Sequence, residues 1–281
     1  MAPQFDGRSR RRMSGGARRG AAAVIVFGVV AACAGSAGAQ ELTPATPAGP
    51  SEPQAPSFRA FGRGLGLSFT TSLFSQQNLL PAATGGTVAL TLAPYDQQIS
   101  SALRGTNTSV GSIGDAAGGT IAMMSIVGGT VTASLFSHSS RLKSTAFALA
   151  QAETVQIAIV QSMKYIAQRE RPDGSDNLSF PSGHAADAFT VAAVFSNYYG
   201  WKWGIPLYAA AGLVAVSRVE KGKHWPSDVA VGATIGLLAG RSGILTTERL
   251  GGVRKASRVT IAPILGVRCW GVAVSVLPET R

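Results

Sequence analysis

Three short strings in the second half of the sequence combine cations, hydroxyl groups and histidine rings at fixed spacing. The first contains Lys164 and Arg171, which are seven residues apart and precede Pro172. Two turns of helix would place both cations on one side, about 10 Å apart along the axis, before the proline ends the helix. The two side chains could therefore converge on one anion.

The second string runs from Phe180 to His184 and precedes Ala185–Tyr199, an alanine-rich segment that predicts a helix. Ser182 is a candidate N-cap of this helix, and Gly183 permits a close approach of the backbone. Free N–H groups at the start of a helix bind anions, and a serine hydroxyl adds another donor. The ring of His184 would then face the bound anion.

The third string contains Arg218, His224 and Asp228. Pro226 suits the first turn of a new helix that would run to about Gly240, so Asp228 would lie in that turn. Its carboxylate could reach back to the imidazole of His224, fix the tautomer and leave the other ring nitrogen free as a nucleophile. Arg218 supplies a forked donor that matches phosphate oxygens.

Together the strings resemble, in this order, the three signatures of the type 2 phosphatidic acid phosphatase (PAP2) superfamily: Lys164-x6-Arg171-Pro172, Pro181-Ser182-Gly183-His184 and Ser217-Arg218-x5-His224-x3-Asp228. The resemblance covers roughly Tyr95 to Gly240. It implies an all-α helical bundle of the PAP2/chloroperoxidase type. It also implies a metal-independent phosphomonoesterase that hydrolyses lipid or small-molecule phosphate esters through a phosphohistidine.

The resemblance also implies a role for each matching residue. The phosphate would be bound by five groups: Lys164, Arg171, Ser182, Gly183 and Arg218. His224 would attack phosphorus, Asp228 would orient it, and His184 would protonate the leaving alcohol and then activate water. No cofactor and no metal is implied, which agrees with a sequence that has three histidines and no acidic cluster with metal-ligand spacing. The third histidine, His138, is given no role.

Two other functions stay open. A vanadium-dependent haloperoxidase would hold vanadate in the same cradle, although such enzymes are typically much longer. An inactive, envelope-anchored binding module is the second alternative, and the intact set of eight site positions argues against it. The substrate is also open, because some superfamily members are integral-membrane lipid phosphatases and others are exported soluble acid phosphatases. Polar residues before the first string favour the soluble group, with membrane contact as an alternative.

The elements that position these strings are predicted to be helices, in a domain spanning residues 58–250. Most uncharged segments are too short to cross a bilayer. The exception, Ala116–Ser137, has 22 uncharged residues and could be a membrane span or a central buried helix. At the C-terminus, the alternation in Val259–Leu265 and Val272–Leu277 predicts a small β-hairpin appendage within residues 251–281.

The N-terminal region predicts export to the periplasm or cell envelope. The pattern of residues 1–39 is typical of a signal peptide, with a basic segment, an apolar run and small residues for cleavage after Ala39. Cys33 lies in a lipobox-like string, so a lipid anchor is the alternative to cleavage. Residues 40–57 are a Pro/Ala-rich linker. Cys269 would have no partner, so no intrachain disulfide is expected.

Composition excludes several classes of protein. Hydrophobic residues make up 46% of the 281-residue chain and charged residues 14%, which suits one large core and excludes a disordered chain. The net charge is +11, but six arginines lie within residues 1–39. Nucleic acid is therefore not an expected partner; the expected partner is a phosphate ester. The oligomeric state stays open.

Overall fold

The computed structural model describes residues 55–104, 109–251, 259–265 and 270–276. The chain divides into two compact units, of which one comprises residues 46–255 and the other contains the C-terminal strands. The predicted signal peptide, residues 40–54 of the predicted linker, Cys33 and Cys269 lie outside the described residues.

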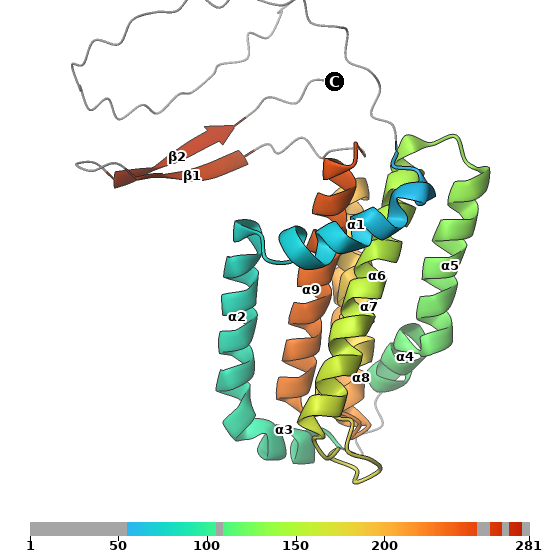
Figure 1. Ribbon diagram of the computed structural model, residues 1–281. Helices are drawn as coiled ribbons and strands as arrows, with labels where there is room; N and C mark the ends of the chain where they lie inside the picture. The colour runs from blue at the N-terminus through green and yellow to red at the C-terminus, as the bar shows by residue number, and fades with distance from the viewer. Residues whose placement is uncertain (1–54, 105–108, 252–258, 266–269, 277–281) are drawn as a thin grey trace, which may run out of the picture. The chain divides into compact units, whose positions relative to one another are not determined.

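The first unit is helical, which confirms the all-α prediction (Figure 1). Short 3-10 or π turns occupy Phe58–Ala60, Ser68–Ser72 and Ala93–Tyr95. The α-helices are α1 (Phe61–Leu67), α2 (Gln76–Leu92), α3 (Asp96–Leu103), α4 (Ser109–Gly118), α5 (Thr120–Phe136), α6 (Ser140–Ala167), α7 (Gly183–Tyr199), α8 (Trp201–Glu220) and α9 (Pro226–Arg249).

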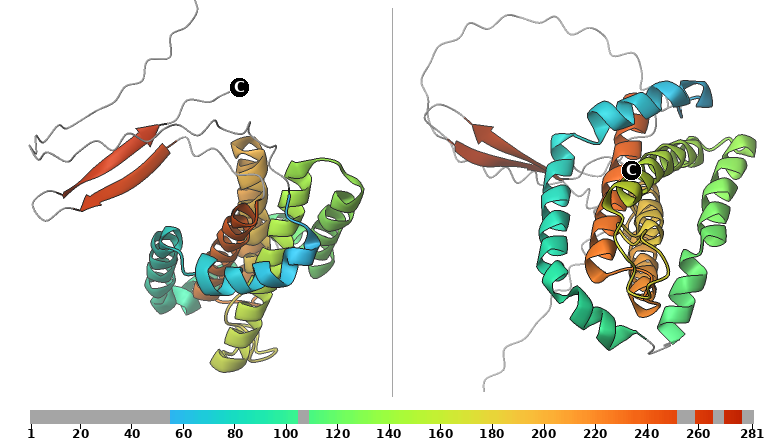
Figure 2. Two further views of the ribbon diagram at one scale, coloured as in Figure 1. Left: turned by 45° about the horizontal axis from the view of Figure 1, so that its top comes forward. Right: turned by 60° about the horizontal axis from the view of Figure 1, so that its bottom comes forward.

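Three long helices, α6, α7 and α9, pack against one another at the centre of the bundle. Helix α8 packs on α7, α2 flanks α9, and α5 flanks α6 (Figures 1 and 2). Small and branched side chains such as Leu149, Ala192 and Val214 form the buried core between them. Because α6 and α8 run toward the same end of the bundle, the α6–α7 and α8–α9 connections meet there (Figure 1). This arrangement brings the three strings together.

The central helices approach closely because α9 presents glycines to its neighbours. A Cβ added at Gly236 would lie 2.3 Å from the carbonyl oxygen of Ala186, and one at Gly243 would lie equally close to that of Ala148. A backbone atom cannot move aside as a flexible side chain can. Glycine at these positions therefore sets how closely α9 packs on α7 and α6.

We expect Gly236→Ala to destabilise the protein by about 1–3 kcal/mol, because the added methyl group forces α9 away from α7. Thermal unfolding of the purified protein measures the effect. Gly212→Ala on α8 is the matched control, since a Cβ there meets no atom within 4 Å. The control should be neutral or stabilising by up to about 1 kcal/mol. Equal effects of the two substitutions would contradict this packing argument.

Two predicted helix ends are corrected by the structure. Helix α6 ends at Ala167 rather than at Pro172, because Gln168 adopts a left-handed conformation (φ 46°) and turns the chain out of the helix. Arg171 thus lies in the connection after α6, and the predicted two-turn spacing from Lys164 along one helix is wrong. Helix α9 continues to Arg249, beyond the predicted end near Gly240.

The uncharged segment Ala116–Ser137 is not a central buried helix. It is split between α4 and α5, which meet around Gly119 at a bend of 43°. Helix α5 packs against α6 from outside the central helices, and its Ile121 and Phe136 are exposed.

In the second unit, strand β1 (Val259–Leu265) pairs antiparallel with β2 (Trp270–Val276). The register joins Val259 to Val276 and Leu265 to Trp270. The first strand has the predicted limits, and the second begins two residues earlier than predicted.

Candidate active site

Six of the eight predicted site residues line one pocket at the end of the bundle where the two connections meet. The pocket has a volume of about 690 Å³. The six residues are Lys164, Arg171, Gly183, His184, Arg218 and His224. The other two predicted residues, Ser182 and Asp228, are fully buried and lie outside the pocket lining.

His224 lies in the connection between α8 and α9 and is 2% exposed. Its Nδ1 lies 2.5 Å from the carbonyl oxygen of Ser179. A carbonyl oxygen only accepts hydrogen bonds, so we assign the proton of the neutral ring to Nδ1. The lone pair on Nε2 is then available as a nucleophile.

This geometry corrects the predicted contact between Asp228 and His224. The Asp228 carboxylate accepts hydrogen bonds from Arg169 Nη1 at 2.6 Å, from the Trp225 N–H at 2.9 Å and from the Ser179 hydroxyl. The Nδ1 partner is instead the Ser179 backbone. Asp228 therefore acts on the ring through Ser179, whose hydroxyl it binds and whose carbonyl holds His224. These contacts suit a role for Asp228 in positioning the ring.

Arg169 was missed by sequence reasoning. Its guanidinium bridges Asp228 to Asp96 on α3, with the second contact at 2.8 Å. Asp96 also accepts a hydrogen bond from the Ser227 N–H at 2.8 Å. These partners are far apart in the sequence, and no spacing rule links them. The resulting network ties α3, the α6–α7 connection and the start of α9 together behind the pocket.

The predicted anion-binding cations are held by neighbouring oxygens. Lys164 Nζ donates to the carbonyl oxygen of Leu178 at 2.6 Å, and Arg171 Nε donates to Asp176 at 2.6 Å. Hydrogen bonds from Arg171 and from the Leu178 N–H lower the pKa of Asp176 below its ordinary value. Arg218 is only 6% exposed, near the end of α8. Three cations thus face one pocket, which suits an anion.

Ser182 supplies an independent indication of an anion site. It is the N-cap residue of α7, yet its side chain makes no capping hydrogen bond. Its hydroxyl is buried without a hydrogen-bond partner among the residues that the structure describes. Gly183 begins α7 and lines the pocket. A buried hydroxyl beside the N-terminus of a helix fits an oxyanion.

His184, the second residue of α7, lies partly buried in the pocket. It shares the pocket with the predicted nucleophile, so it could exchange a proton with a group attacked by His224. Among the described residues, no group of three or more His, Cys, Asp or Glu side chains could hold a metal ion.

Burial, together with the charge of Lys164, lowers the pKa of His224 to about 3. The unfolded chain binds a proton at this ring below about pH 6.5. The neutral ring therefore stabilises the fold above that pH, and this contribution is lost as the pH falls toward 3.

We expect the melting temperature of the wild type to fall more steeply than that of His224→Gln between about pH 7 and pH 4. Parallel curves would contradict this prediction.

Comparison with known proteins gives a match to the PAP2 superfamily over residues 145–250, which include all eight predicted site residues. The lipid A 1-phosphatase of Porphyromonas gingivalis is 40% identical over 88 residues, which cover 30% of this chain and 20% of that protein. The decaprenylphosphoryl-5-phosphoribose phosphatase of Mycobacterium tuberculosis is 35% identical over 110 residues, 36% of this chain and 58% of the relative. The chain thus spans less than two thirds of either relative.

Two solved structures are similar to the chain. The crystal structure of Aquifex aeolicus LpxE matches with a TM-score of 0.45 and 22% identity. The match covers 54% of this chain and 94% of that chain. A transmembrane PAP2 type phosphatidylglycerolphosphate phosphatase from Bacillus subtilis matches with a TM-score of 0.46 and 24% identity. This match covers 63% of this chain and 93% of that chain.

Proposed function

We propose, from the premise that residues 145–250 belong to the PAP2 superfamily, that this protein hydrolyses phosphate monoesters of membrane lipids. The observation that carries the proposal is the single pocket that unites the three cations and both histidines. The relatives are named phosphatases, and their names specify lipid A and a decaprenyl-linked sugar phosphate. A lipid-linked phosphate is therefore the substrate class we infer.

In the proposed reaction, the phosphate oxygens are bound by five groups: the side chains of Lys164, Arg171 and Arg218, the Ser182 hydroxyl and the Gly183 N–H. These donors stabilise negative charge on the oxygens during transfer. His224 Nε2 attacks phosphorus, and the bond from phosphorus to the alcohol oxygen breaks. A protonated His184 donates its proton to that oxygen, so the alcohol leaves neutral.

In the second half of the reaction, water attacks the phosphohistidine while His184 accepts a proton from the water. The bond between His224 and phosphorus breaks, and inorganic phosphate leaves. Throughout the reaction the Nδ1–H of His224 donates its hydrogen bond to the Ser179 carbonyl oxygen, which keeps Nε2 directed at phosphorus.

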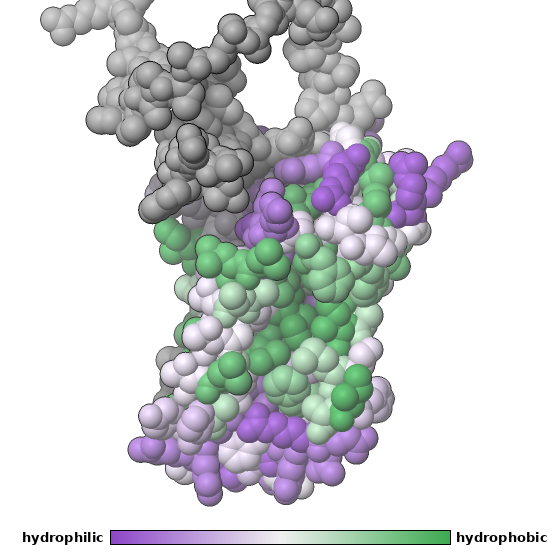
Figure 3. Space-filling view, turned by 60° about the vertical axis from the view of Figure 1, so that its left-hand side comes forward, coloured by the Kyte–Doolittle hydropathy of each residue, from purple (hydrophilic) through white to green (hydrophobic). Residues whose placement is uncertain are grey.

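The exposed surface favours a membrane setting. Large apolar side chains point outward from α2, α5, α6 and α8: Leu79, Leu80, Leu90, Ile121, Met124, Leu135, Phe136, Ile157, Ile166 and Ile205. Figure 3 shows such a band between hydrophilic ends on one face. Among the described residues, α9 is the one single helix that is long and apolar enough to cross the roughly 30 Å apolar core of a bilayer, and α4 with α5 could form a second, bent span.

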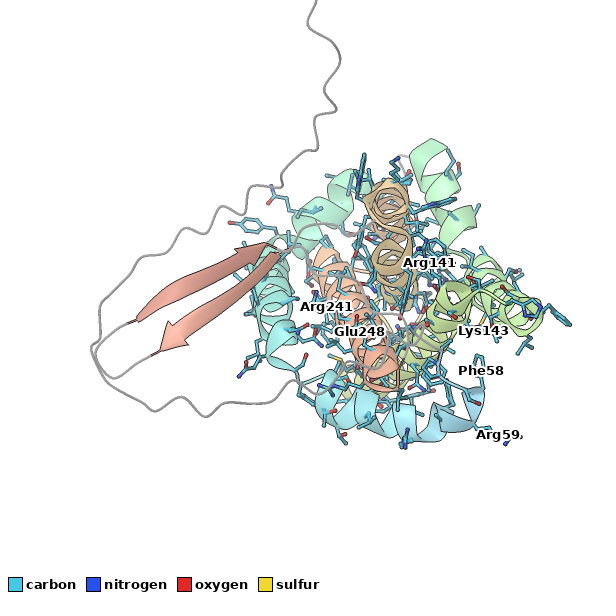
Figure 4. The ribbon with its side chains drawn as sticks, turned by 90° about the horizontal axis from the view of Figure 1, so that it is seen from above. Phe58, Arg59, Arg141, Lys143, Arg241 and Glu248 are labelled. Carbon is cyan, nitrogen blue, oxygen red and sulfur yellow. The ribbon has the colours of Figure 1, made fainter. Side chains whose placement is uncertain are left out.

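The two ends of the bundle carry residues typical of membrane boundaries. Trp201 and Trp203 are exposed at the end opposite the pocket, and Tyr95 and Tyr165 are exposed near the pocket. Arg59, Arg141 and Lys143 lie at the end of the bundle away from the pocket, which Figure 4 shows from above. Aromatic rings and cations prefer the membrane interface. The sequence favoured a soluble enzyme, whereas this surface supports an integral one.

Phosphate release by the full chain in detergent, with EDTA present, tests the proposal. We expect release from dioleoyl phosphatidate to exceed release from p-nitrophenyl phosphate, and His224→Gln to release phosphate at least about 10³-fold more slowly. Activity on the soluble ester alone would refute the lipid substrate. A folded protein that releases phosphate from neither substrate would refute the proposed function.

A further inference from the structure

Three polar side chains in the pocket wall that have no part in the proposed reaction are joined by hydrogen bonds. Glu153 and Gln156 come from α6, and Asp187 comes from α7. Gln156 Nε2 donates to Glu153 Oε2 at 3.1 Å and also to Asp187 Oδ1. We call these three residues the acid–amide cluster. Glu153 is 8% exposed and Gln156 is 1% exposed, so these two side chains are removed from bulk water, whereas Asp187 is partly buried.

The acid–amide cluster has more acceptors than donors. Glu153 Oε1 and Gln156 Oε1 are buried without a hydrogen-bond partner among the residues that the structure describes. The Gln156 amide already donates to both carboxyl groups, so it has no N–H left for these oxygens. Leaving a buried acceptor unpaired is unfavourable. The pocket wall is therefore suited to a ligand that donates hydrogen bonds.

The acid–amide cluster is placed where it could contact the leaving alcohol. Asp187 follows His184 by three residues on α7, which places it about 4.5 Å further along the axis and on a similar side of the helix. Glu153 precedes Lys164 by eleven residues on α6, or about 16 Å. An alcohol protonated by His184 and extending along the pocket away from the phosphate would thus reach Asp187 first.

We propose that Glu153, Gln156 and Asp187 form a leaving-group site that accepts hydrogen bonds from hydroxyl groups of the alcohol. The preferred substrates would be phosphate esters of lipids with a free hydroxyl near the phosphate, as in a polyol or sugar. A leaving group without such donors would leave the acceptors unpaired. An ammonium group is disfavoured, because Lys164, Arg171, Arg218 and Lys223 line the same pocket. This inference rests on the proposed phosphatase activity.

Two substrates that differ by one hydroxyl test the site: 1-oleoyl lysophosphatidate and its 2-deoxy analogue, oleoyl propanediol phosphate. In the same detergent micelles, we expect kcat/KM of the wild type to be at least about tenfold higher for the hydroxyl-bearing substrate. Glu153→Gln and Asp187→Asn should reduce this ratio to about threefold or less, with rates on the deoxy analogue close to wild type.

Thr154→Val is the matched control. Thr154 lines the same pocket, but its hydroxyl donates to the Ala150 carbonyl oxygen at 2.8 Å. This variant should keep the wild-type ratio. A wild-type ratio near one would overturn the leaving-group site, as would acid variants that slow both substrates equally. Absence of turnover on both lipids and on p-nitrophenyl phosphate would instead refute the phosphatase activity, and the leaving-group site with it.

Discussion

His224→Gln is expected to reduce kcat for phosphate release by at least about 10³-fold, because it removes the side chain that we propose accepts the phosphoryl group. An amide cannot form the covalent intermediate. Glutamine is close to histidine in size and can still donate to the Ser179 carbonyl, so the fold should persist. Turnover on dioleoyl phosphatidate measures the loss, and a thermal melt at neutral pH checks the fold.

His138→Gln is the matched control for this substitution. His138 is exposed in the connection before α6, and no catalytic role was predicted for it. The control should keep wild-type turnover. If folded His224→Gln retained a tenth or more of the wild-type rate, His224 would not be the nucleophile.

The second large effect is expected for Asp228→Asn. An asparagine has one acceptor oxygen, whereas the carboxylate accepts from Arg169, Ser179 and Trp225. At least one of these donors loses its partner, and Arg169 loses a buried counter-charge. We expect a loss of stability of about 3 kcal/mol and, in the folded fraction, a drop of about 10²-fold in kcat.

The drop in kcat should reflect a displaced ring rather than lost substrate binding. KM should therefore change much less than kcat. Ser179→Ala keeps the backbone carbonyl but lacks the hydroxyl held by Asp228, and should give a smaller loss. Asp176→Asn is the matched control, because that carboxylate is 43% exposed and pairs with Arg171 outside the buried network. Equal effects of Asp176→Asn and Asp228→Asn would contradict the positioning role.

The sequence predicted the residue types of the site because they occur in three compact strings. It could not predict how the His224 ring is held, since the partner of Nδ1 is a backbone carbonyl at Ser179. Every residue type carries such a carbonyl, so no sequence signal marks it. The bridging role of Arg169 depends on Asp96, 73 positions away, and follows only from the packing of α3.

The sequence pattern did not favour the proposed membrane setting, for a different reason. Polar residues such as Gln151 and Gln156 interrupt the apolar pattern of α6, which favoured a soluble helix. In the structure both are buried within the bundle, whereas Ile157 and Ile166 of the same helix are exposed. Polar side chains inside a bundle do not prevent its outer surface from facing lipid. Counting charges along the sequence cannot distinguish the face of a helix that packs inside the bundle from the face that is exposed.

The central claim is that the phosphoryl group passes through His224. Its most direct test is to quench the wild type rapidly during turnover of ³²P-labelled phosphatidate and to map the label by peptide. The account predicts an acid-labile, base-stable label on the peptide that contains His224. An enzyme that turns over under these conditions without any label, or with the label on another residue, would contradict it.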